Sequence, residues 1–303
     1  MKSFKELIAT AKKSGKKRCV VIMAQDATVL ESVKLAQELD IAYPVLIGDQ
    51  TNIKERGKAV GLDLDNVEIH NAAEENEALE KGIALVREKG DFLMKGMVST
   101  SAFLKGILNR DWGLRSSKIL SHIAVLEIPG YDKLIFMSDG GMNPKLDLDV
   151  RLNIISNAIK TLRMLGIKEP KIGLVAASET IHPDMPETID AAEIVKLYKN
   201  GEIKNCIIEG PFGFDVPISK EAAEHKKIQS KIAGEVDFLL MPSISAANIW
   251  AKGLIFFANT KAAGMVAGAA KPVIMLSRAD KPETKLNSIA LGVVLSANKE
   301  PND

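Results

Sequence analysis

The chain has 303 residues, which is enough for two domains or one large domain. Charged residues make up 26% of it and apolar residues 46%, as in ordinary globular proteins, and the formal net charge is +1. So small a charge creates no field that would favour nucleic acid, and 5% aromatic residues are too few for base-stacking platforms. The composition therefore argues against a nucleic-acid partner.

The N-terminal segment Met1–Lys13 is amphipathic and charged, and it lacks the continuous apolar stretch of a secretory signal. The sequence has no run of about 18 or more apolar residues, so we expect no membrane span. Cys19 and Cys206 lie in apolar, strand-like runs and are predicted to be buried, reduced thiols. These features predict a cytoplasmic protein.

Short apolar runs alternate with helical patterns along almost the whole chain, which is typical of a parallel sheet covered by helices. The helical patterns include residues 28–38, 77–88, 149–165, 188–198 and 283–296. The predicted strands are 18–24, 44–47, 67–70, 91–95, 122–128, 134–137, 171–175, 205–209, 237–241 and 272–276.

One place breaks the alternation. Two strands, 121–128 and 133–137, are separated only by Pro-Gly-Tyr-Asp, which predicts a hairpin. The tight turn Ser138–Pro144 and a long helix follow, and we place a domain boundary there. Ten strands with a hairpin fit two α/β domains better than a regular eightfold barrel.

Several familiar signatures are missing from the sequence. It contains no G-x-x-x-x-G-K-[ST] phosphate loop and no G-x-G-x-x-G after a strand. It also contains no G-x-S-x-G and no H-E-x-x-H. Its four histidines show no metal-ligand spacing, so no metal site is predicted.

The most informative segment is the last strand-to-helix turn. Strand 272–276 is followed at once by Ser277, Arg278 and Asp280, and a helix begins near Pro282. Ligands of open α/β sheets bind beyond the carboxyl ends of strands. A hydroxyl, a guanidinium and a helix N-terminus suit an anion such as phosphate. The same residues also fit an ordinary capping turn with a surface arginine.

A second segment has a similar composition. A predicted strand ends at Lys95 and Gly96, and Ser99 and Thr100 then begin an amphipathic helix that carries Lys105. Glycine allows close backbone approach, and hydroxyl groups at the positive end of a helix suit an anion. Helix capping with surface lysines is the alternative.

Three further segments leave both alternatives open. Ser138–Pro144 could only turn the chain or could expose backbone amides to a ligand. The carboxylates of Glu209–Asp215 could be catalytic or could cap a turn. Ala262–Ala270 is rich in small residues, which allow close helix packing or leave room for a slender ligand.

Five segments in this order resemble the phosphate acyltransferases, that is, the phosphate acetyl- and butyryltransferases. They are K-G-M-V-S-T-S-A-F-L-K, S-H-I-A-V-L-E, I-E-G-P-F-G-F-D, F-L-L-M-P-S-I-S-A-A-N-I and A-K-P-V-I-M-L-S-R-A-D. The resemblance covers nearly the whole chain. The length and the segment Ser277–Leu291 are most similar to the butyryl branch.

The resemblance implies two α/β/α domains with the active site in the cleft between them, the fold of isocitrate and isopropylmalate dehydrogenases. The first domain would comprise residues 1–140 and 270–303, and the second residues 141–269. The implied reaction is butyryl-CoA + phosphate = butyryl phosphate + CoA. No bound cofactor or metal is implied, coenzyme A thioester is a substrate, and a homo-oligomer (a dimer or higher) is expected.

The resemblance also implies roles for individual residues. Ser277, Arg278 and Asp280 would be catalytic: Arg278 would hold phosphate and offset charge on the carbonyl oxygen, and Ser277 would donate a hydrogen bond. Phosphate would further contact Lys95, Gly96, Ser99 and Thr100. Coenzyme A would lie near Lys105, Arg115, Gly264 and Gly268.

Two positions depart from the family pattern. Acetyl-type members carry an aspartate seven residues after the serine, where this chain has Thr284, so Asp280 and Glu283 are the nearest carboxylates. Lys105 stands where many members have arginine. Three alternatives remain: a phosphate acetyltransferase, a metal- and NAD-dependent dehydrogenase of a phosphorylated hydroxy acid on the same fold, and a non-catalytic acyl-CoA or phosphate-binding regulator.

Overall fold

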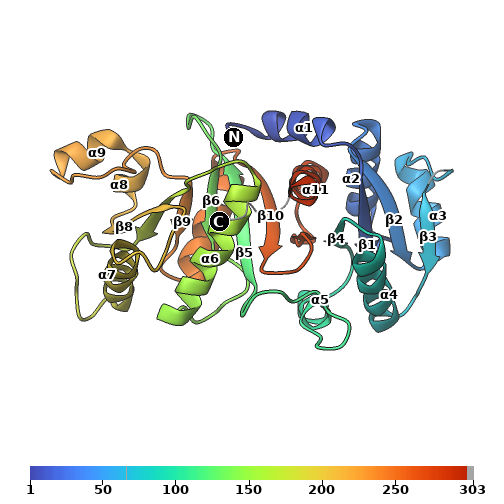
Figure 1. Cartoon of the computed structure of the whole chain (residues 1–303). Coiled ribbons are helices and arrows are strands. Elements are labelled where there is room, and N and C mark those ends of the chain that lie inside the picture. The colour runs from blue at the N-terminus through green and yellow to red at the C-terminus, as the bar shows by residue number, and fades with distance from the viewer. Residues whose placement is uncertain (66, 299–303) are drawn as a thin grey trace. The chain divides into compact units, whose positions relative to one another are not determined.

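The computed structural model describes residues 1–65 and 67–298 (Figure 1). These residues form two compact units. The terminal unit comprises residues 3–118 and 262–298, and the central unit comprises residues 1–2 and 119–261. The units differ from the expected domains in three segments: 1–2 and 119–140 belong to the central unit, and 262–269 belong to the terminal unit. Residues 299–303 of the expected first domain lie outside the described residues.

The terminal unit is built on one sheet, whose strand order is β3-β2-β1-β4-β11-β10. All neighbouring strands are parallel except β10, which runs antiparallel to β11. The strands are β1 (Lys17–Ile22), β2 (Ala42–Gly48), β3 (Glu68–Asn71), β4 (Phe92–Lys95), β10 (Lys261–Ala267) and β11 (Val273–Ile274).

Helices cover both faces of this sheet (Figure 1). They are α1 (Phe4–Lys13), α2 (Ala27–Glu38), α3 (Gln50–Val60), α4 (Glu75–Glu88), α5 (Thr100–Ile107) and α11 (Pro282–Ala297). Helix α11 packs against α1 and α2 on one face, and α4 packs against α5 on the other. Every residue of α11 from Lys285 to Leu295 is buried, so this helix forms the centre of the unit's core.

The sheet of the central unit has the strand order β5-β6-β9-β7-β8. Its strands are β5 (Ser121–Glu127), β6 (Ile135–Ser138), β7 (Lys171–Val175), β8 (Ile207–Phe212) and β9 (Phe238–Leu240). Strands β5 and β6 pair antiparallel, which confirms the predicted hairpin, and the other pairs are parallel.

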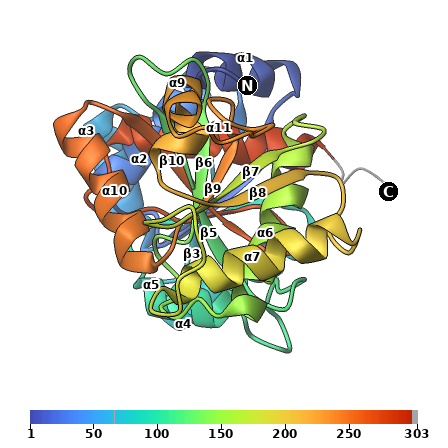
Figure 2. The same ribbon diagram turned by 90° about the vertical axis from the view of Figure 1, so that its left-hand side faces the viewer.

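Two layers of helices flank the central sheet. The helices are α6 (Leu148–Met164), α7 (Pro186–Lys199), α8 (Asp215–Ile218), α9 (Lys220–His225) and α10 (Ile244–Phe257). Figure 2 shows α6 and α7 on one face and α10 on the other. The ring of Trp250, on α10, makes a T-shaped contact with the ring of Phe214, which immediately precedes α8, with ring centroids 5.0 Å apart. This contact joins α10 and α8 in one apolar cluster with Ala247 and Leu239.

All ten predicted strands and the five predicted helices are confirmed within a few residues. Strand β10 was not predicted, because its sequence K-A-A-G-M-V-A is poor in the residues that favour strands. Cys19 and Cys206 are buried and unpaired, as expected, and burial raises the pKa of Cys206 to about 12. Across the described ranges, no helix has the length and apolar content needed to cross a bilayer.

Candidate functional site

The residues predicted to be catalytic and to bind phosphate all belong to the terminal unit, where three neighbouring strands end. Strand β4 lies between β1 and β11 and is parallel to both. Lys95 is opposite Ile22 at the end of β1, and Ile274 at the end of β11 is opposite Met94. The segments that follow β4 and β11 therefore leave the same edge of the sheet side by side. This is the edge at which α/β proteins bind ligands.

The turn after β11 is closed by its own hydrogen bonds. The amide of Ser277 donates to Oδ2 of Asp280 over 2.8 Å, and the amide of Asp280 donates to the carbonyl oxygen of Ser277 over 3.2 Å. The side chains of Ser277 and Arg278 are exposed. Asp280 thus holds the turn, while Ser277 and Arg278 remain accessible at the strand end.

Lys95 and Gly96 end β4 in a crowded position. Lys95 is only 6% exposed, and its Nζ lies 3.4 Å from the carbonyl oxygen of Gly96. A Cβ on Gly96 would come within 2.4 Å of the Met23 carbonyl oxygen and 2.5 Å of the Ile22 carbonyl oxygen. The glycine is therefore needed for close approach, as expected, but the approach is to the backbone at the end of β1.

The start of α5 combines helix capping with an acidic neighbour. Ser99 is the N-cap, and its Oγ accepts a hydrogen bond of 3.1 Å from the Ala102 amide. The amide of Ser99 itself donates to Oε1 of Glu75 over 3.0 Å. Thr100 is the first residue of the helix and is exposed. The capping alternative is thus present at Ser99, while its hydroxyl proton and Thr100 remain available to a ligand.

Arg278 and Lys285 both act on the charge of Lys95 beside these strand ends. Burial lowers the pKa of Lys95, and the charges of Arg278 and Lys285 lower it further. Glu75 and Asp26 act against that shift. Arg278 and Lys285 therefore lie close enough to Lys95 to disfavour its charged form.

Asp26 and Lys285 were missed by the sequence analysis. Asp26 caps α2, and its Oδ1 accepts hydrogen bonds from Thr28 Oγ1 (2.6 Å) and the Val29 amide (3.0 Å). Burial acts to raise the pKa of Asp26, but these hydrogen bonds and the charge of Lys285 outweigh it and lower the pKa. Asp26 could have been found, because it follows a predicted strand. Lys285 gives no such signal, since a lysine within a helix usually faces solvent.

Of the residues predicted to contact coenzyme A, Lys105 lies on the last turn of α5. It is exposed and lines a cavity of about 380 Å³. Ser99, Asn76 and Trp112 line the same cavity, which therefore connects the start of α5 with Lys105. The cavity offers an aromatic ring, amide groups and a cation together.

The other three residues predicted to contact coenzyme A have structural partners. Arg115 donates from Nε to the Ser117 carbonyl oxygen over 3.0 Å, and from its guanidinium to the Lys118 carbonyl oxygen. The Gly268 carbonyl oxygen accepts hydrogen bonds from the amides of Ser116 (3.1 Å) and Ser117 (2.9 Å).

Gly264 lies in β10, and its amide donates to Ser288 Oγ of α11 over 3.0 Å. The small residues of β10 therefore serve close packing on α11, one of the two alternatives drawn from the sequence.

The acidic segments of the central unit are engaged in structural contacts. Asp139 accepts hydrogen bonds of 2.8 Å from the amides of Gly141 and Met142, so it closes the turn after β6. Lys226 pairs with Asp215, and this hydrogen bond lowers the pKa of Asp215. Glu209 accepts from the Lys231 amide over 3.1 Å. For Ser138–Pro144 the contacts correspond to a turn of the chain, and for Glu209–Asp215 they correspond to a structural role of the carboxylates.

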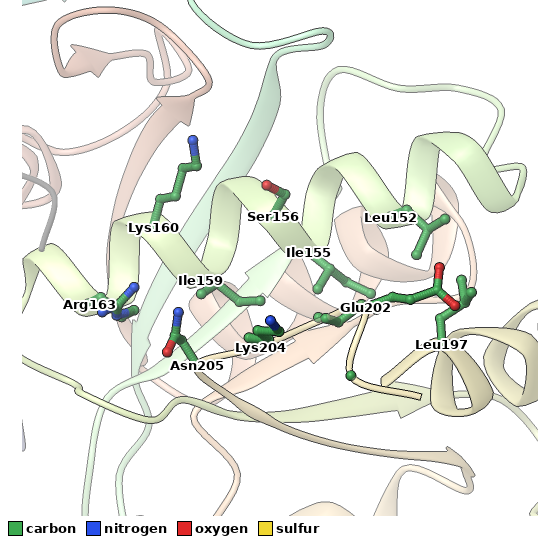
Figure 3. Close-up of a pocket in the computed structure, with 12 residues that line it drawn as sticks. Leu152, Ile155, Ser156, Ile159, Lys160, Arg163, Leu197, Glu202, Lys204 and Asn205 are labelled. Carbon is green, nitrogen blue, oxygen red and sulfur yellow. The ribbon is translucent and has the colours of Figure 1, made fainter. Parts of the chain in front are cut away.

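A larger cavity, of about 560 Å³, lies in the central unit between α6 and the loop after α7 (Figure 3). Ile155 and Ile159 contribute apolar side chains, and Lys160 and Lys204 contribute cations. None of the predicted site residues lines it. Within the described ranges, no three of the His, Cys, Asp and Glu side chains gather as metal ligands would.

Comparison with known proteins identifies the family of this chain. Residues 3–90 and 75–293 match the sequence model of a family described as phosphate acetyl/butaryl transferase. The chain is 39% identical over 300 residues to a phosphate butyryltransferase of Clostridium acetobutylicum, covering 99% of this chain and all of that one. It is 36% identical over 291 residues to a phosphate acetyltransferase of Thermotoga maritima, covering 96% of this chain and 99% of that one.

A solved structure has a similar fold. It is a branched-chain phosphotransacylase from Enterococcus faecalis V583, with a TM-score of 0.84 and 25% identity, covering 93% of this chain and all of that one. Together with the family match over nearly all residues, these similarities show that this chain is an enzyme of the phosphate acetyl/butaryl transferase family.

Proposed function

We propose that this enzyme transfers a butyryl group between coenzyme A and inorganic phosphate: butyryl-CoA + phosphate = butyryl phosphate + CoA. As a family member it is a phosphate acyltransferase. The observation that carries the proposal is the meeting of Lys95, Ser277 and Arg278 at the ends of β4 and β11. Butyryl is chosen over acetyl because the Clostridium acetobutylicum relative bears that name.

In the proposed mechanism a phosphate oxygen attacks the thioester carbonyl carbon. A new C–O bond forms, the C–S bond breaks, and coenzyme A leaves as the thiolate. Negative charge grows on the carbonyl oxygen during the attack. Arg278 holds the phosphate and offsets that charge with its forked donor, and Ser277 donates a hydrogen bond to the carbonyl oxygen or the departing sulfur. Holding both substrates in place can contribute about 7 kcal/mol or more.

Asp280 enters the mechanism mainly through Ser277. Its carboxylate accepts a hydrogen bond from the Ser277 amide, and this bond fixes the turn that carries the Ser277 hydroxyl group. Phosphate bound as the dianion needs no strong base, because a phosphate group loses its second proton near neutral pH. Thr284 in place of an aspartate is compatible with this route. We therefore propose that Asp280 orients the turn that carries Ser277, beside which phosphate, the nucleophile, binds.

We further propose that coenzyme A binds along α5, with a phosphate of its nucleotide near Lys105 and its adenine beside Trp112. The cavity shared by Ser99, Lys105 and Trp112 supports this position. The structural contacts described above are made by Arg115, Gly264 and Gly268. Their contact with coenzyme A stays a prediction. The isocitrate dehydrogenase-like fold name and the cleft also stay predictions.

The enzyme is also proposed to act in the cytoplasm as a homo-oligomer, a dimer or higher, without a bound cofactor. Helix α10 supports self-association, because Ile249 and Phe256 are 72% exposed and Phe257 is 92% exposed. Exposed apolar patches of this kind often mark protein–protein interfaces. Sedimentation of the purified protein would give its oligomeric state.

The proposed function is tested by measuring the release of coenzyme A thiol from butyryl-CoA with and without phosphate. We expect release that depends on phosphate. A series from acetyl- to valeryl-CoA should show the highest kcat/KM with butyryl, because each methylene in an apolar pocket contributes about 1–3 kcal/mol. A maximum at acetyl would identify a phosphate acetyltransferase. Metal-dependent NAD reduction, or binding without turnover, would contradict the proposal.

Ser99 allows capping and phosphate binding to be separated. Ser99→Ala should lower the free energy of unfolding by about 1 kcal/mol, because the Ala102 amide loses its cap. Ser99→Asp should preserve the cap but raise the KM for phosphate, because it adds a second carboxylate next to Glu75. Urea unfolding and initial-rate kinetics measure the two effects. An unchanged KM for phosphate in Ser99→Asp would place the phosphate away from α5.

A further inference from the structure

Lys285 occupies a position that is unfavourable for a cation. It lies in the first turn of α11, where the positive end of the helix dipole disfavours a positive charge. It is also only 3% exposed, and burial lowers the pKa of its ammonium group. A buried charge normally requires a partner that compensates for lost hydration. The surroundings of Lys285 must therefore compensate both for its burial and for its place in the first turn of the helix.

The main contact of Lys285 is with the turn that carries the catalytic residues. Its Nζ donates a hydrogen bond to the carbonyl oxygen of Asp280. The carboxylate of Asp280 in turn accepts a hydrogen bond from the Ser277 amide. Lys285 thus ties the end of the Ser277–Asp280 turn to the buried helix α11, and it limits where Arg278, inside that turn, can lie.

The charges around Lys285 indicate an anionic ligand. Asp280 and Asp26 stabilise its charge, but Lys95, which is itself buried, is repelled by both Lys285 and Arg278. Arg278 and Lys285 thus both disfavour the charged form of Lys95, and Glu75 and Asp26 act against them. A doubly charged anion among the three cations would convert that repulsion into attraction.

We propose that Lys285 completes the phosphate-binding site: it adds its charge to those of Lys95 and Arg278, and it holds the Ser277–Asp280 turn in place. The inference rests on the proposed function, which identifies the anion as phosphate. It adds a residue that the family resemblance did not supply. It also accounts for a buried lysine in the first turn of a helix.

The test uses the full chain with Lys285→Met, which has a similar length but no charge. We expect the KM and the Kd for inorganic phosphate to rise roughly 10-fold or more, because a hydrogen bond or contact to a charged group is lost. The KM for butyryl-CoA should stay within about twofold. The melting temperature without phosphate should fall, because the Asp280 carbonyl oxygen and the carboxylates of Asp280 and Asp26 lose the cation beside them.

Lys281→Met is the matched control, because Lys281 is exposed at the N-cap of the same helix and its side chain makes no capping bond. It should bind phosphate as the wild type does. Unchanged phosphate binding in Lys285→Met would overturn the proposal. If Lys285→Met both melts earlier and binds phosphate weakly, Lys285→Arg decides: recovered phosphate binding supports the charge, and no recovery overturns it.

Calorimetric titration with inorganic phosphate alone keeps this inference separate from the proposed function. Wild-type protein that binds phosphate but turns over no acyl-CoA would contradict the function and leave the role of Lys285 intact. Turnover by the wild type, together with unaltered phosphate affinity in Lys285→Met, would overturn the role of Lys285 and leave the proposed function intact.

Discussion

Replacement of Arg278 by alanine is expected to lower kcat/KM for phosphate-dependent thiol release roughly 30- to 1,000-fold, which corresponds to about 2–4 kcal/mol. Arg278 is exposed at the end of β11, beside Lys95, and has the forked donor geometry that suits a phosphate group. Loss of this donor removes an interaction that strengthens as charge develops. Initial rates at varied phosphate and butyryl-CoA would measure the effect.

Two further variants make this result specific. Arg278→Lys keeps the charge but loses the fork, so it should recover only part of the activity. Arg56→Ala removes an exposed arginine from α3 in the same unit, and it should leave the rate unchanged. Near-normal activity in Arg278→Ala would remove Arg278 from the mechanism. A fall in melting temperature that matched the fall in rate would point to misfolding instead.

The sequence predicted the elements of the fold well, because most of them carry a clear apolar period. It failed at β10, where alanine and glycine dominate and the apolar pattern resembles a packing segment. It also placed 119–140 with the terminal residues. The pairing that assigns them to the central unit joins Phe136 of β6 to Phe238 of β9, far apart in the chain. Such long-range pairing leaves no local signal.

The candidate site was predictable where side chains follow strands. Lys95, Ser277 and Arg278 were found because each stands just beyond an apolar run, and the parallel register of β4 and β11 brings those ends together. Lys285 could not be found in this way, since its burial depends on how α11 packs between neighbouring helices. Arg115, whose contact with coenzyme A stays a prediction, looks available in sequence as a cation in a loop, but in the structure its guanidinium donates to nearby carbonyl oxygens.

The other large effect is expected on stability, in the central unit. Arg151 is 5% exposed and joins α6 to the end of β9, since its guanidinium donates to the Pro242 carbonyl oxygen over 2.9 Å. Its Nε lies 3.1 Å from Oδ2 of Asp190 on α7. Arg151→Ala would leave Asp190 and the carbonyl oxygens without their donor. We expect the free energy of unfolding to fall by about 3–5 kcal/mol.

Because a chain with two units can unfold in steps, the measurement must report on the central unit alone. The chain has two tryptophans, and Trp250 packs on Phe214 in the central unit while Trp112 belongs to the terminal unit. In a Trp112→Phe background, Trp250 fluorescence during urea unfolding follows the central unit. Arg151→Ala should lower the midpoint with an unchanged slope, and Lys145→Ala, an exposed cation just before α6, should shift the free energy by less than about 0.5 kcal/mol. An unchanged midpoint in Arg151→Ala would mean that water replaces the arginine at these carbonyl oxygens, and the connection of α6, α7 and β9 would then rest on apolar packing.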